Sequence, residues 1–286
     1  MSRLCESLLR KRERRSAERE HARLLRRHES ELWERGLELV AGVDEAGRGP
    51  LAGPVVAAAV VLPRDLSFGG IDDSKKLTPS RREELFDLIN AEAVAVGVGQ
   101  MSESVIDEIN ILRATHRAMR EAIEGLGLPP DHVLVDGDPI PDLTLPQTAI
   151  HRGDEKSAAI AAASIIAKVT RDRLLVEYDG RFPGYGFARH KGYGTPGHIA
   201  ALTRLGPCEI HRRSFSPVLS SGGGYSEEFA RFRRAMLESD DADSLDQVAA
   251  LVAQGKEGLA PYELSKLRGL YKRSYGRVRM GLKRRR

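Results

Sequence analysis

The stretch that decides the fold reads Ala41-Gly42-Val43-Asp44-Glu45-Ala46-Gly47-Arg48-Gly49-Pro50, followed by the apolar run Val55–Leu62. Two adjacent carboxylates end a short apolar segment, and a Gly-Arg-Gly turn follows them at once. Because like charges repel and burial raises a carboxyl pKa, keeping both acids ionised favours a hard divalent cation. The turn offers a guanidinium and backbone N–H groups to a phosphate. The stretch therefore predicts a metal-dependent enzyme that acts on a phosphodiester.

The length and composition of the chain favour one substantial core with extensions. The chain has 286 residues, of which 41% are hydrophobic, and this is enough to bury one large core. The sequence contains no run of about 18 apolar residues, so we expect no transmembrane helix, and the basic N-terminus lacks the apolar segment of a secretory signal. The two cysteines, Cys5 and Cys208, lie far apart in no metal-ligand spacing. We therefore expect unpaired thiols and a cytoplasmic location. We also expect a monomer.

The net charge of +4 is distributed unevenly along the chain. Residues 1–38 carry +3 and residues 226–286 carry +5, whereas the middle of the chain carries −4. An acidic metal site between basic extensions that hold phosphates would give this pattern. Solvated helix faces would give it equally well, so charge alone leaves both interpretations open.

The central segment reads as strands that end in carboxylates. Residues 39–62 predict a β-hairpin whose second strand is buried on both faces, residues 93–100 predict a third strand, and residues 144–150 predict a weaker one. His132–Gly137 predicts a short buried strand that ends in Asp136, and sites form at the carboxyl ends of strands in open α/β sheets. Taken alone, Asp136 is equally typical of an Asp-Gly turn. Because neighbours on a strand face opposite ways, Asp44 and Glu45 share a site only if the strand ends or bulges there.

Helices are predicted around these strands. We expect helices over residues 79–92 with Thr78 as N-cap, from Val105 to about Gly125, over 158–172, and from Pro196 to Leu205. Asp154 lies just before the third of these, where capping the helix is an alternative to catalysis. His116 falls on the apolar stripe of the second helix, where we expect a packed core histidine, and Asn110 on the same helix is a candidate nucleic-acid contact.

The ends of the chain are predicted to be helical extensions. Residues 1–38 read as one charged, peripheral helix with Gly36 at its C-cap. Residues 220–225 read as a Gly/Ser linker, and residues 226–286 as a basic helical extension with helices over 226–238, 245–253 and 261–271. From Lys266 onward the chain holds ten Lys/Arg and no acid, which favours a non-specific nucleic-acid arm.

Several polar residues in loops and on helices are candidate phosphate or substrate contacts. For Ser74, Lys75 and Lys76 the alternative is a solvated loop. Tyr193 is flanked by glycines and is free to offer its ring or hydroxyl to a substrate. The other candidates are Ser74, Lys75 and Lys76 in one loop, Ser164, Lys168 and Arg171 on one helix, and His190 and His211 beside basic loop residues.

Five motifs together resemble the bacterial ribonuclease HII family over roughly residues 39–219. They are Val43–Val55, which contains Asp-Glu-Ala-Gly-Arg-Gly-Pro; Asp73-Ser74-Lys75-Lys76-Leu77; Val135-Asp136-Gly137; Ala161–Asp172; and His190-Lys191-Gly192-Tyr193-Gly194-Thr195. Residues 1–38 and those after Ser220 lie outside the resemblance. The resemblance implies a catalytic domain at residues 39–219 with a ribonuclease H-like α/β fold, a mixed five-stranded sheet flanked by helices.

The resemblance also implies an activity and a metal. The family hydrolyses the RNA strand of RNA–DNA hybrids and cuts 5′ of single ribonucleotides in duplex DNA, leaving a 5′-phosphate and a 3′-hydroxyl. By resemblance, Asp44, Glu45, Asp136 and Asp154 are the four catalytic acids; they hold Mg²⁺ or Mn²⁺, with Asp44 and Asp136 as central ligands. Two divalent cations would nearly neutralise four carboxylates, in keeping with the acidic middle of the chain.

Discrimination between RNA and DNA needs a reader of the 2′-hydroxyl. By resemblance, the backbone of Gly47-Arg48-Gly49 reads this group and the junction phosphate, because glycines allow close approach. Tyr193 resembles the family tyrosine that stacks on the sugar of the following deoxynucleotide. The resemblance assigns backbone phosphates to Ser74, Lys75, Ser164 and Lys168.

Three other classes of protein are weighed against this interpretation. A dinucleotide-binding enzyme needs Gly-x-Gly-x-x-Gly before a helix, but here the glycines are differently spaced and an apolar strand follows. A non-catalytic nucleic-acid-binding protein would use the acids as caps and turns, and the set of four argues against it. A DNA-only nuclease or recombinase of the same fold differs only in the strand it cuts, and the Gly-Arg-Gly turn with Tyr193 favours RNA.

Overall fold

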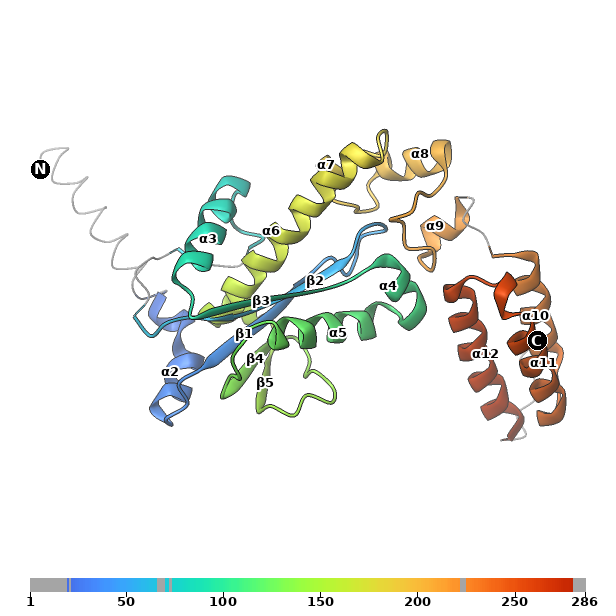
Figure 1. The fold of residues 1–286 in the computed structure, drawn as a ribbon, viewed down its shortest axis with the longest axis horizontal. Helices are drawn as coiled ribbons and strands as arrows, with labels where there is room; N and C mark the ends of the chain where they lie inside the picture. Colours follow the sequence, from blue (N-terminus) through green and yellow to red (C-terminus); the bar gives the residue numbers. More distant parts are fainter. Residues whose placement is uncertain (1–19, 21, 66–69, 72–73, 222–224, 280–286) are drawn as a thin grey trace, which may run out of the picture. The chain divides into compact units, whose positions relative to one another are not determined.

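The computed structural model describes residues 20, 22–65, 70–71, 74–221 and 225–279. Within them a five-stranded mixed sheet is flanked by helices, as the sequence predicts (Figure 1). The strands are β1 (Val40–Ala46), β2 (Val55–Val61), β3 (Ala95–Met101), β4 (His132–Asp136) and β5 (Gln147–Ile150), in the spatial order β3-β2-β1-β4-β5. The predicted hairpin is confirmed because β1 pairs antiparallel with β2, whereas β4 pairs parallel with both β1 and β5.

The chain divides into two compact units. The first comprises Met1–Arg48, Pro54–Met101 and Ala114–Leu174, and it contains the sheet. The second comprises Gly49–Gly53, Ser102–Arg113 and Leu175–Arg286. Each unit is described below by itself.

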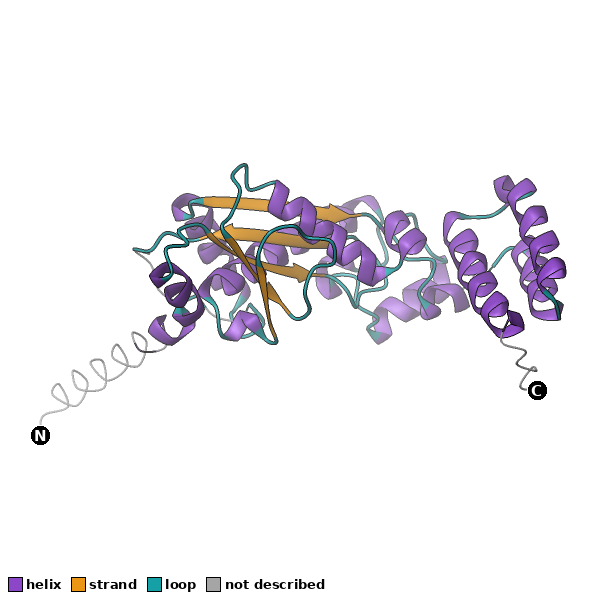
Figure 2. Cartoon of the chain, turned by 90° about the horizontal axis from the view of Figure 1, so that it is seen from below, coloured by secondary structure: helices purple, strands orange, loops and turns teal. Residues whose placement is uncertain are grey.

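In the first unit, helices cover both faces of the sheet (Figure 2). Helices α3 (Pro79–Glu92) and α6 (Ala158–Arg181) contribute Leu85, Ile89 and a run of alanines to one core with Ala58 and Val60 of β2. Helix α5 (Ile111–Glu124) packs on β3, where a Cβ at Gly97 would lie 2.0 Å from the Ala122 carbonyl oxygen. The small residues of the sheet therefore admit close helix packing, as the alanine-rich second strand suggests.

Helix α6 packs directly on β1, the strand of the acidic stretch. A Cβ at Gly42 would lie 2.1 Å from the backbone of Ala159. Helix α2 (Arg27–Glu34) adds Leu32, which packs with Val40, Leu134 and Ile160. Because every second residue of a strand points to the same face of the sheet, Asp44 lies on the same face as Gly42, toward α6.

Helix caps explain why some helix bounds follow from the sequence. Thr78 accepts a hydrogen bond from the Arg81 N–H at the start of α3, and Thr195 does the same for His198 in α8 (Pro196–Leu205). In both helices a proline follows the cap, so the N-cap threonine and the proline both define where the helix starts.

Other predicted bounds are wrong. The helix expected from Val105 to Gly125 is broken at Asn110, whose φ of +73° separates α4 (Glu103–Ile109) from α5. As a result the buried face of α5 carries Ala118 and Met119, whereas Leu112 is exposed and His116 is half-buried rather than packed in the core. Helix α6 runs nine residues beyond its predicted end, since it ends at Arg181 rather than Asp172.

The predicted N-terminal helix is also corrected in part. It is interrupted at Arg26, the N-cap of α2, and it is not peripheral, because Leu25, Glu29 and Leu32 are buried. The Glu29 carboxylate accepts hydrogen bonds from the Ser157 hydroxyl and the Ala159 N–H at the start of α6. Predictions about Cys5 and the rest of residues 1–19, Gly222–Gly224 and residues 280–286 lie outside the described residues.

The second unit holds the glycine-rich loops and the C-terminal helices. Its further helices are α7 (Phe187–His190), α9 (Ser216–Ser220), α10 (Glu227–Glu238), α11 (Ala242–Gln254) and α12 (Pro261–Arg279), the last eight residues longer than predicted. Helices α10, α11 and α12 share a core of Phe229, Phe232, Met236, Leu245 and Leu267. Among the described residues no helix is long and apolar enough to cross a membrane.

Candidate active site

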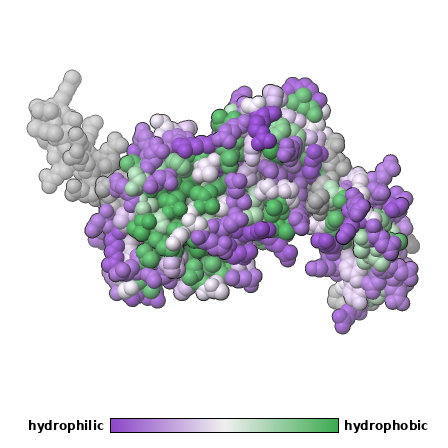
Figure 3. Space-filling view, viewed as in Figure 1, coloured by the Kyte–Doolittle hydropathy of each residue, from purple (hydrophilic) through white to green (hydrophobic). Residues whose placement is uncertain are grey.

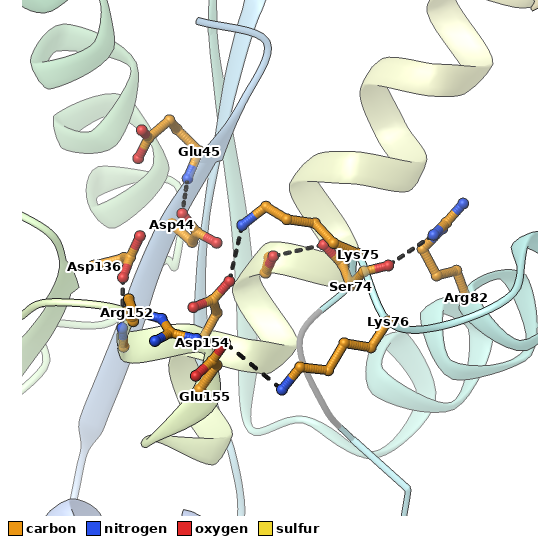
Figure 4. A network of polar contacts seen from close by, with 12 residues as sticks. Asp44, Glu45, Ser74, Lys75, Lys76, Arg82, Asp136, Arg152, Asp154 and Glu155 are labelled. Atoms are coloured by element: carbon orange, nitrogen blue, oxygen red, sulfur yellow. Dashed lines mark hydrogen bonds and ion pairs between the residues drawn. The ribbon is translucent and has the colours of Figure 1, made fainter.

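Asp44 and Asp136 lie at the ends of neighbouring parallel strands. The β1–β4 pairing runs from Val40↔His132 to Val43↔Val135, and each acid follows directly. Gly42 pairs with Leu134, so Asp44 and Asp136, two residues further along, project from the same face. Figure 4 shows the two carboxylates beside each other at this edge. The sheet register therefore places the two acids together.

Backbone N–H groups hold these two side chains. The Glu45 N–H donates to Asp44 Oδ1 over 2.6 Å, and the Gly153 N–H donates to Asp136 Oδ1 over 2.6 Å. Such bonds fix the orientation of a carboxylate and favour its ionised form. The Ser164 side chain on α6 lies close enough to Asp44 to lower the pKa of its carboxyl group.

Glu45 leaves the opposite face of β1. Pairing with β2 continues without a bulge through Glu45↔Ala57 and Ala46↔Val56, so the two neighbouring acids share no face. Pairing with β4 has already stopped at Val43, however, and the Glu45 carboxylate lies close enough for Asp136 to raise its pKa. Burial raises that pKa most, and the Arg48 guanidinium, 3.1 Å from Glu45 Oε1, opposes the increase. The strand end, rather than a bulge, therefore brings Glu45 to the site.

Asp44 carries the strongest electrostatic stress of the site. Its side chain is 4% exposed, and burial raises its pKa well above the ordinary value, with Glu45 and then Asp136 adding repulsion. A buried set of hard oxygen donors with excess negative charge suits a divalent cation. The donor set therefore fits divalent cations by its chemistry. Among the described residues, no three acid, histidine or cysteine side chains form a ready-made metal cluster.

Asp154 approaches from the 3₁₀ turn η1 (Gly153–Glu155), immediately before α6. Its carboxylate is buried and lies 3.1 Å from the ammonium of Lys75, whose own side chain is largely exposed. Lys76 and Glu155 form a parallel pair at 3.6 Å. Figure 4 shows Lys75 reaching over Asp154 toward the acids. The predicted loop 74–76 and the fourth acid therefore meet in the structure.

Ser74 and Ser164 lie behind this edge. Both are buried, and their hydroxyl oxygens are 2.8 Å apart. Lys168, one turn beyond Ser164 on α6, pairs with Asp172 at 2.8 Å. The two serines therefore support Asp44 and the 74–76 loop in this structure. The accessible positive charges are the ammonium groups of Lys75 and Lys168.

The turn after the acids is shaped by a buried arginine. Gly47 has a φ of +98°, and a Cβ there would lie 2.1 Å from Nε of Arg171. Arg171 is 1% exposed and donates from Nε to the Pro54 carbonyl. Only glycine fits at position 47 without displacing Arg171. The sequence placed Arg171 on a helix face with Ser164 and Lys168 but did not predict its packing against Gly47 or its hydrogen bond to the Pro54 carbonyl.

In the second unit, the loop Gly49–Gly53 meets Tyr193. The Leu51 N–H donates to the Gly192 carbonyl, and a Cβ at Gly49 would lie 3.8 Å from Cε1 of Tyr193. The Tyr193 side chain is 46% exposed. The structure therefore brings the last glycine of Gly-Arg-Gly together with the tyrosine that the sequence singled out.

A buried histidine cluster holds this tyrosine loop. His198 Nδ1 donates to the Tyr193 carbonyl, so its Nε2 accepts from His211 Nε2, and His211 Nδ1 accepts from the Cys208 N–H. His190 stacks on His198 and accepts from the Gly192 N–H. Burial lowers the pKa of His198 and lowers that of His211 to about 3. His198 and His211 are thus neutral supports of this loop, and His198 is a residue that the sequence did not indicate.

The comparisons with known proteins agree with this geometry. A family model described as Ribonuclease HII matches residues 41–218. The Ribonuclease HII of Geotalea uraniireducens (strain Rf4) is 58% identical over 190 residues, which cover 66% of this chain and 88% of that protein. The Ribonuclease HII of Geobacillus thermodenitrificans (strain NG80-2) is 55% identical over 215 residues, covering 75% and 83%.

A solved structure is similar over the same region. The ribonuclease H2 from Pyrococcus horikoshii OT3 superposes with a TM-score of 0.54 at 31% identity, covering 64% of this chain and 96% of that one. The RNase HII in the PCNA:RNase HII complex from Archaeoglobus fulgidus gives a TM-score of 0.52 at 32% identity, covering 61% and 93%.

The mixed sheet with acids at its carboxyl edge defines a nuclease of the ribonuclease H-like fold. Within that class, the chain belongs to the ribonuclease HII family. It is a divalent-metal-dependent hydrolase that cleaves the RNA strand of RNA–DNA hybrids. The resemblance inferred from the five sequence motifs is confirmed.

Proposed function

We propose that this enzyme cuts on the 5′ side of a ribonucleotide, including a single one embedded in duplex DNA, and leaves a 5′-phosphate and a 3′-hydroxyl. The observation that carries the proposal is the pair Asp44 and Asp136 on one face of neighbouring strand ends. They lie in the unit that also holds Gly47 and Arg48. A phosphodiester next to a 2′-hydroxyl would suit both the acid pair and the turn that contains Gly47 and Arg48.

Asp44 and Asp136 are proposed as the central metal ligands, with Glu45 as the third and Asp154 completing the catalytic set. Two Mg²⁺ or Mn²⁺ ions bound there would activate the attacking water and stabilise the leaving oxygen. The backbone N–H groups of Glu45 and Gly153 orient the two central carboxylates. Lys75, paired with Asp154, would turn to a substrate phosphate once the carboxylate is otherwise neutralised.

Gly47, Arg48 and Gly49 are proposed to read the 2′-hydroxyl and the junction phosphate through their backbone. The positive φ of Gly47 supports this role, because the turn exposes N–H groups where a side chain would obstruct them. Tyr193 would stack on the sugar of the next deoxynucleotide, and its exposed ring beside Gly49 supports this. Together they would favour a ribonucleotide followed by DNA.

Backbone phosphates are assigned to Ser74, Lys75, Ser164 and Lys168. The exposed ammonium of Lys75 and the partly buried one of Lys168 suit direct contact. The two serines are buried and bonded to each other, so their contribution would pass through the 74–76 loop or require its movement.

We propose that residues 39–219 are the catalytic domain and that residues 1–38 and 226–286 are extensions. Residues 220–225 would link the catalytic domain to the C-terminal extension. All four acids come from one compact unit of one chain, which supports a monomer. A cytoplasmic location fits the free thiol of Cys208, whose pKa burial raises to about 11.

The proposal is tested with a labelled DNA duplex that carries one ribonucleotide, beside an all-DNA duplex. Incubation with Mn²⁺ or Mg²⁺ is expected to cut only the first duplex, 5′ of the ribonucleotide, and EDTA is expected to abolish cutting. Mapping both product ends by mass spectrometry identifies the 5′-phosphate and the 3′-hydroxyl.

Other outcomes would favour other functions. Binding without cutting in either metal would favour a non-catalytic nucleic-acid-binding protein. Cutting of the all-DNA duplex would favour a DNA nuclease or recombinase of the same fold. Cutting of continuous hybrids alone would restrict the activity to the RNA strand and would remove the proposed junction reading.

A further inference from the structure

The C-terminal helices contain a hollow that the catalytic domain does not explain. They lie beyond residue 218, where the family model ends. Helices α10, α11 and α12 have their own apolar core, and the face of this bundle seen in Figure 3 is largely hydrophilic. The three helices therefore form a folded bundle with an apolar core and a polar exposed face.

The hollow has a volume of about 890 Å³ and lies along α10. Arg233, Arg234 and Arg277 line it together with a single acid, Glu238, over a floor that includes Phe229 and Leu237. A smaller adjoining hollow shares Arg234 and Glu238 and adds Arg231 and a second acid, Glu227. Guanidinium groups thus line two adjoining hollows along α10.

The arginines are available to a ligand. Arg233 and Arg234 are exposed, and within the described part of the chain no hydrogen bond or ion pair occupies either guanidinium. Arg277 is half-buried and is fixed by a hydrogen bond from Nη2 to the Ser239 carbonyl over 3.1 Å. One cation is thus held in place while two others can adjust, an arrangement that suits a chain of phosphates.

An aromatic ring borders the same hollow. Tyr225 is 38% exposed and stacks on Phe229, with ring centroids 3.9 Å apart. Exposed aromatic rings beside arginines are typical of surfaces that follow a nucleic-acid strand, because a ring accepts a base or sugar face while arginines take the phosphates. An acidic protein segment would use the arginines but gives no reason for the ring.

We propose that the hollow formed by Tyr225, Arg233, Arg234 and Arg277 is a second nucleic-acid site, which binds the phosphate backbone of the substrate independently of its sequence. The inference rests on the proposed function, because it assumes a nucleic-acid substrate that extends beyond the cut. The site raises affinity and takes no part in cleavage.

The test uses the full chain with the double variant Arg233→Gln/Arg234→Gln. The matched control is Lys256→Gln/Arg268→Gln, which removes two exposed cations outside the hollow, one from the turn between α11 and α12 and one from α12. Binding to a labelled all-DNA duplex is measured between 50 and 200 mM salt. The hollow variant is expected to lower the salt slope by about 2 and low-salt affinity by about tenfold, since each phosphate contact contributes about 0.9 to the slope.

Two further measurements separate the outcomes. Arg233→Lys/Arg234→Lys is expected to keep most of the slope, and turnover on the single-ribonucleotide duplex at saturating concentration is expected to be unchanged in every variant. A salt slope in the hollow variant equal to that of the control would overturn the second site while leaving the proposed function intact. Loss of ribonucleotide-dependent cutting in the wild type would defeat the proposed function instead.

Discussion

Two buried clusters of titratable side chains show opposite solutions to the same electrostatic problem. The histidine cluster of the second unit gives each ring nitrogen of His198 and His211 one hydrogen-bond partner, in the backbone or in the other ring, and burial lowers the pKa of both rings. The acid cluster of the first unit gathers Asp44, Glu45 and Asp136 with too little positive charge to balance them. The histidine cluster satisfies its hydrogen bonds within the protein, whereas the negative charge of the acid cluster is balanced only when it binds cations.

The difference shows where chemistry is expected. A polar cluster that satisfies its own hydrogen bonds rigidifies the loop it touches, here the loop of Tyr193. A cluster whose charges repel one another stores unfavourable energy that a cation can release. The predictions below test this contrast, beginning with the largest expected effect.

Asp44→Asn is expected to abolish cleavage while stabilising the metal-free protein. Loss of a residue that only supports a metal ligand costs about 10- to 100-fold, so loss of a central ligand is expected to exceed 100-fold. The raised pKa of Asp44 means that its ionisation opposes folding, increasingly as pH rises from the ordinary carboxyl pKa through the folded one, and the amide removes this penalty. Turnover and thermal unfolding without metal measure the two effects. Asp142→Asn, an exposed acid between β4 and β5, is the control expected to change neither.

Ser164→Ala is expected to lower turnover by about 10- to 100-fold, because Asp44 loses a neighbouring hydroxyl that favours its ionised form. The Ser74 hydroxyl also loses its partner. The effect should appear in kcat more than in KM if Ser164 acts through Asp44. A change in KM alone would assign Ser164 to a substrate phosphate instead.

His211→Asn is expected to destabilise the protein by about 1–3 kcal/mol, because His198 loses its partner in a buried network. The unfolded histidine binds a proton below about pH 6.5, whereas the folded one does so only near pH 3. Protons therefore favour unfolding, and His211 lowers stability by up to about 1.4 kcal/mol per pH unit as pH falls through this window. The variant should flatten the dependence of unfolding free energy on pH between 7 and 5. The exposed His151→Asn is the control, and an unchanged slope in His211→Asn would show that another group is responsible.

Deletion of residues 222–286 is expected to have the smallest effect on catalysis. The C-terminal bundle has its own core, so its removal should leave turnover at saturating substrate unchanged and weaken binding mainly at low salt. Steady-state kinetics at two salt concentrations measure both quantities. A large loss of turnover would show that the extension belongs to the catalytic machinery.

Local signals explain how much of the fold could be predicted from the sequence. The bounds of α3 and α8 followed from Thr-Pro pairs, which act within one turn of the chain. The break at Asn110 was missed because asparagine tolerates a positive φ without requiring it, so only the packing on both sides decides. The predicted end of α6 at Asp172 was too early, since Gly180 is the first helix-disfavouring residue after Asp172 and the first proline, Pro183, follows Arg181.

The site was predictable in its acids but not in its supports. Asp44 and Asp136 follow apolar strands, and parallel register brings such ends together. The burial of Glu29 against Ser157 joins residues far apart in sequence, and the histidine network depends on α7, α8 and the segment of His211 meeting. Such contacts carry no local pattern. They arise from tertiary packing.

The central claim is that the acid cluster binds divalent cations, which balance its excess negative charge. Calorimetric titration of Mn²⁺ into the full chain, beside Asp44→Asn and Asp142→Asn, tests it most directly. We predict binding by the wild type and by Asp142→Asn, accompanied by a rise in unfolding temperature, and much weaker binding by Asp44→Asn. Equal Mn²⁺ affinity in Asp44→Asn and the wild type would contradict the account.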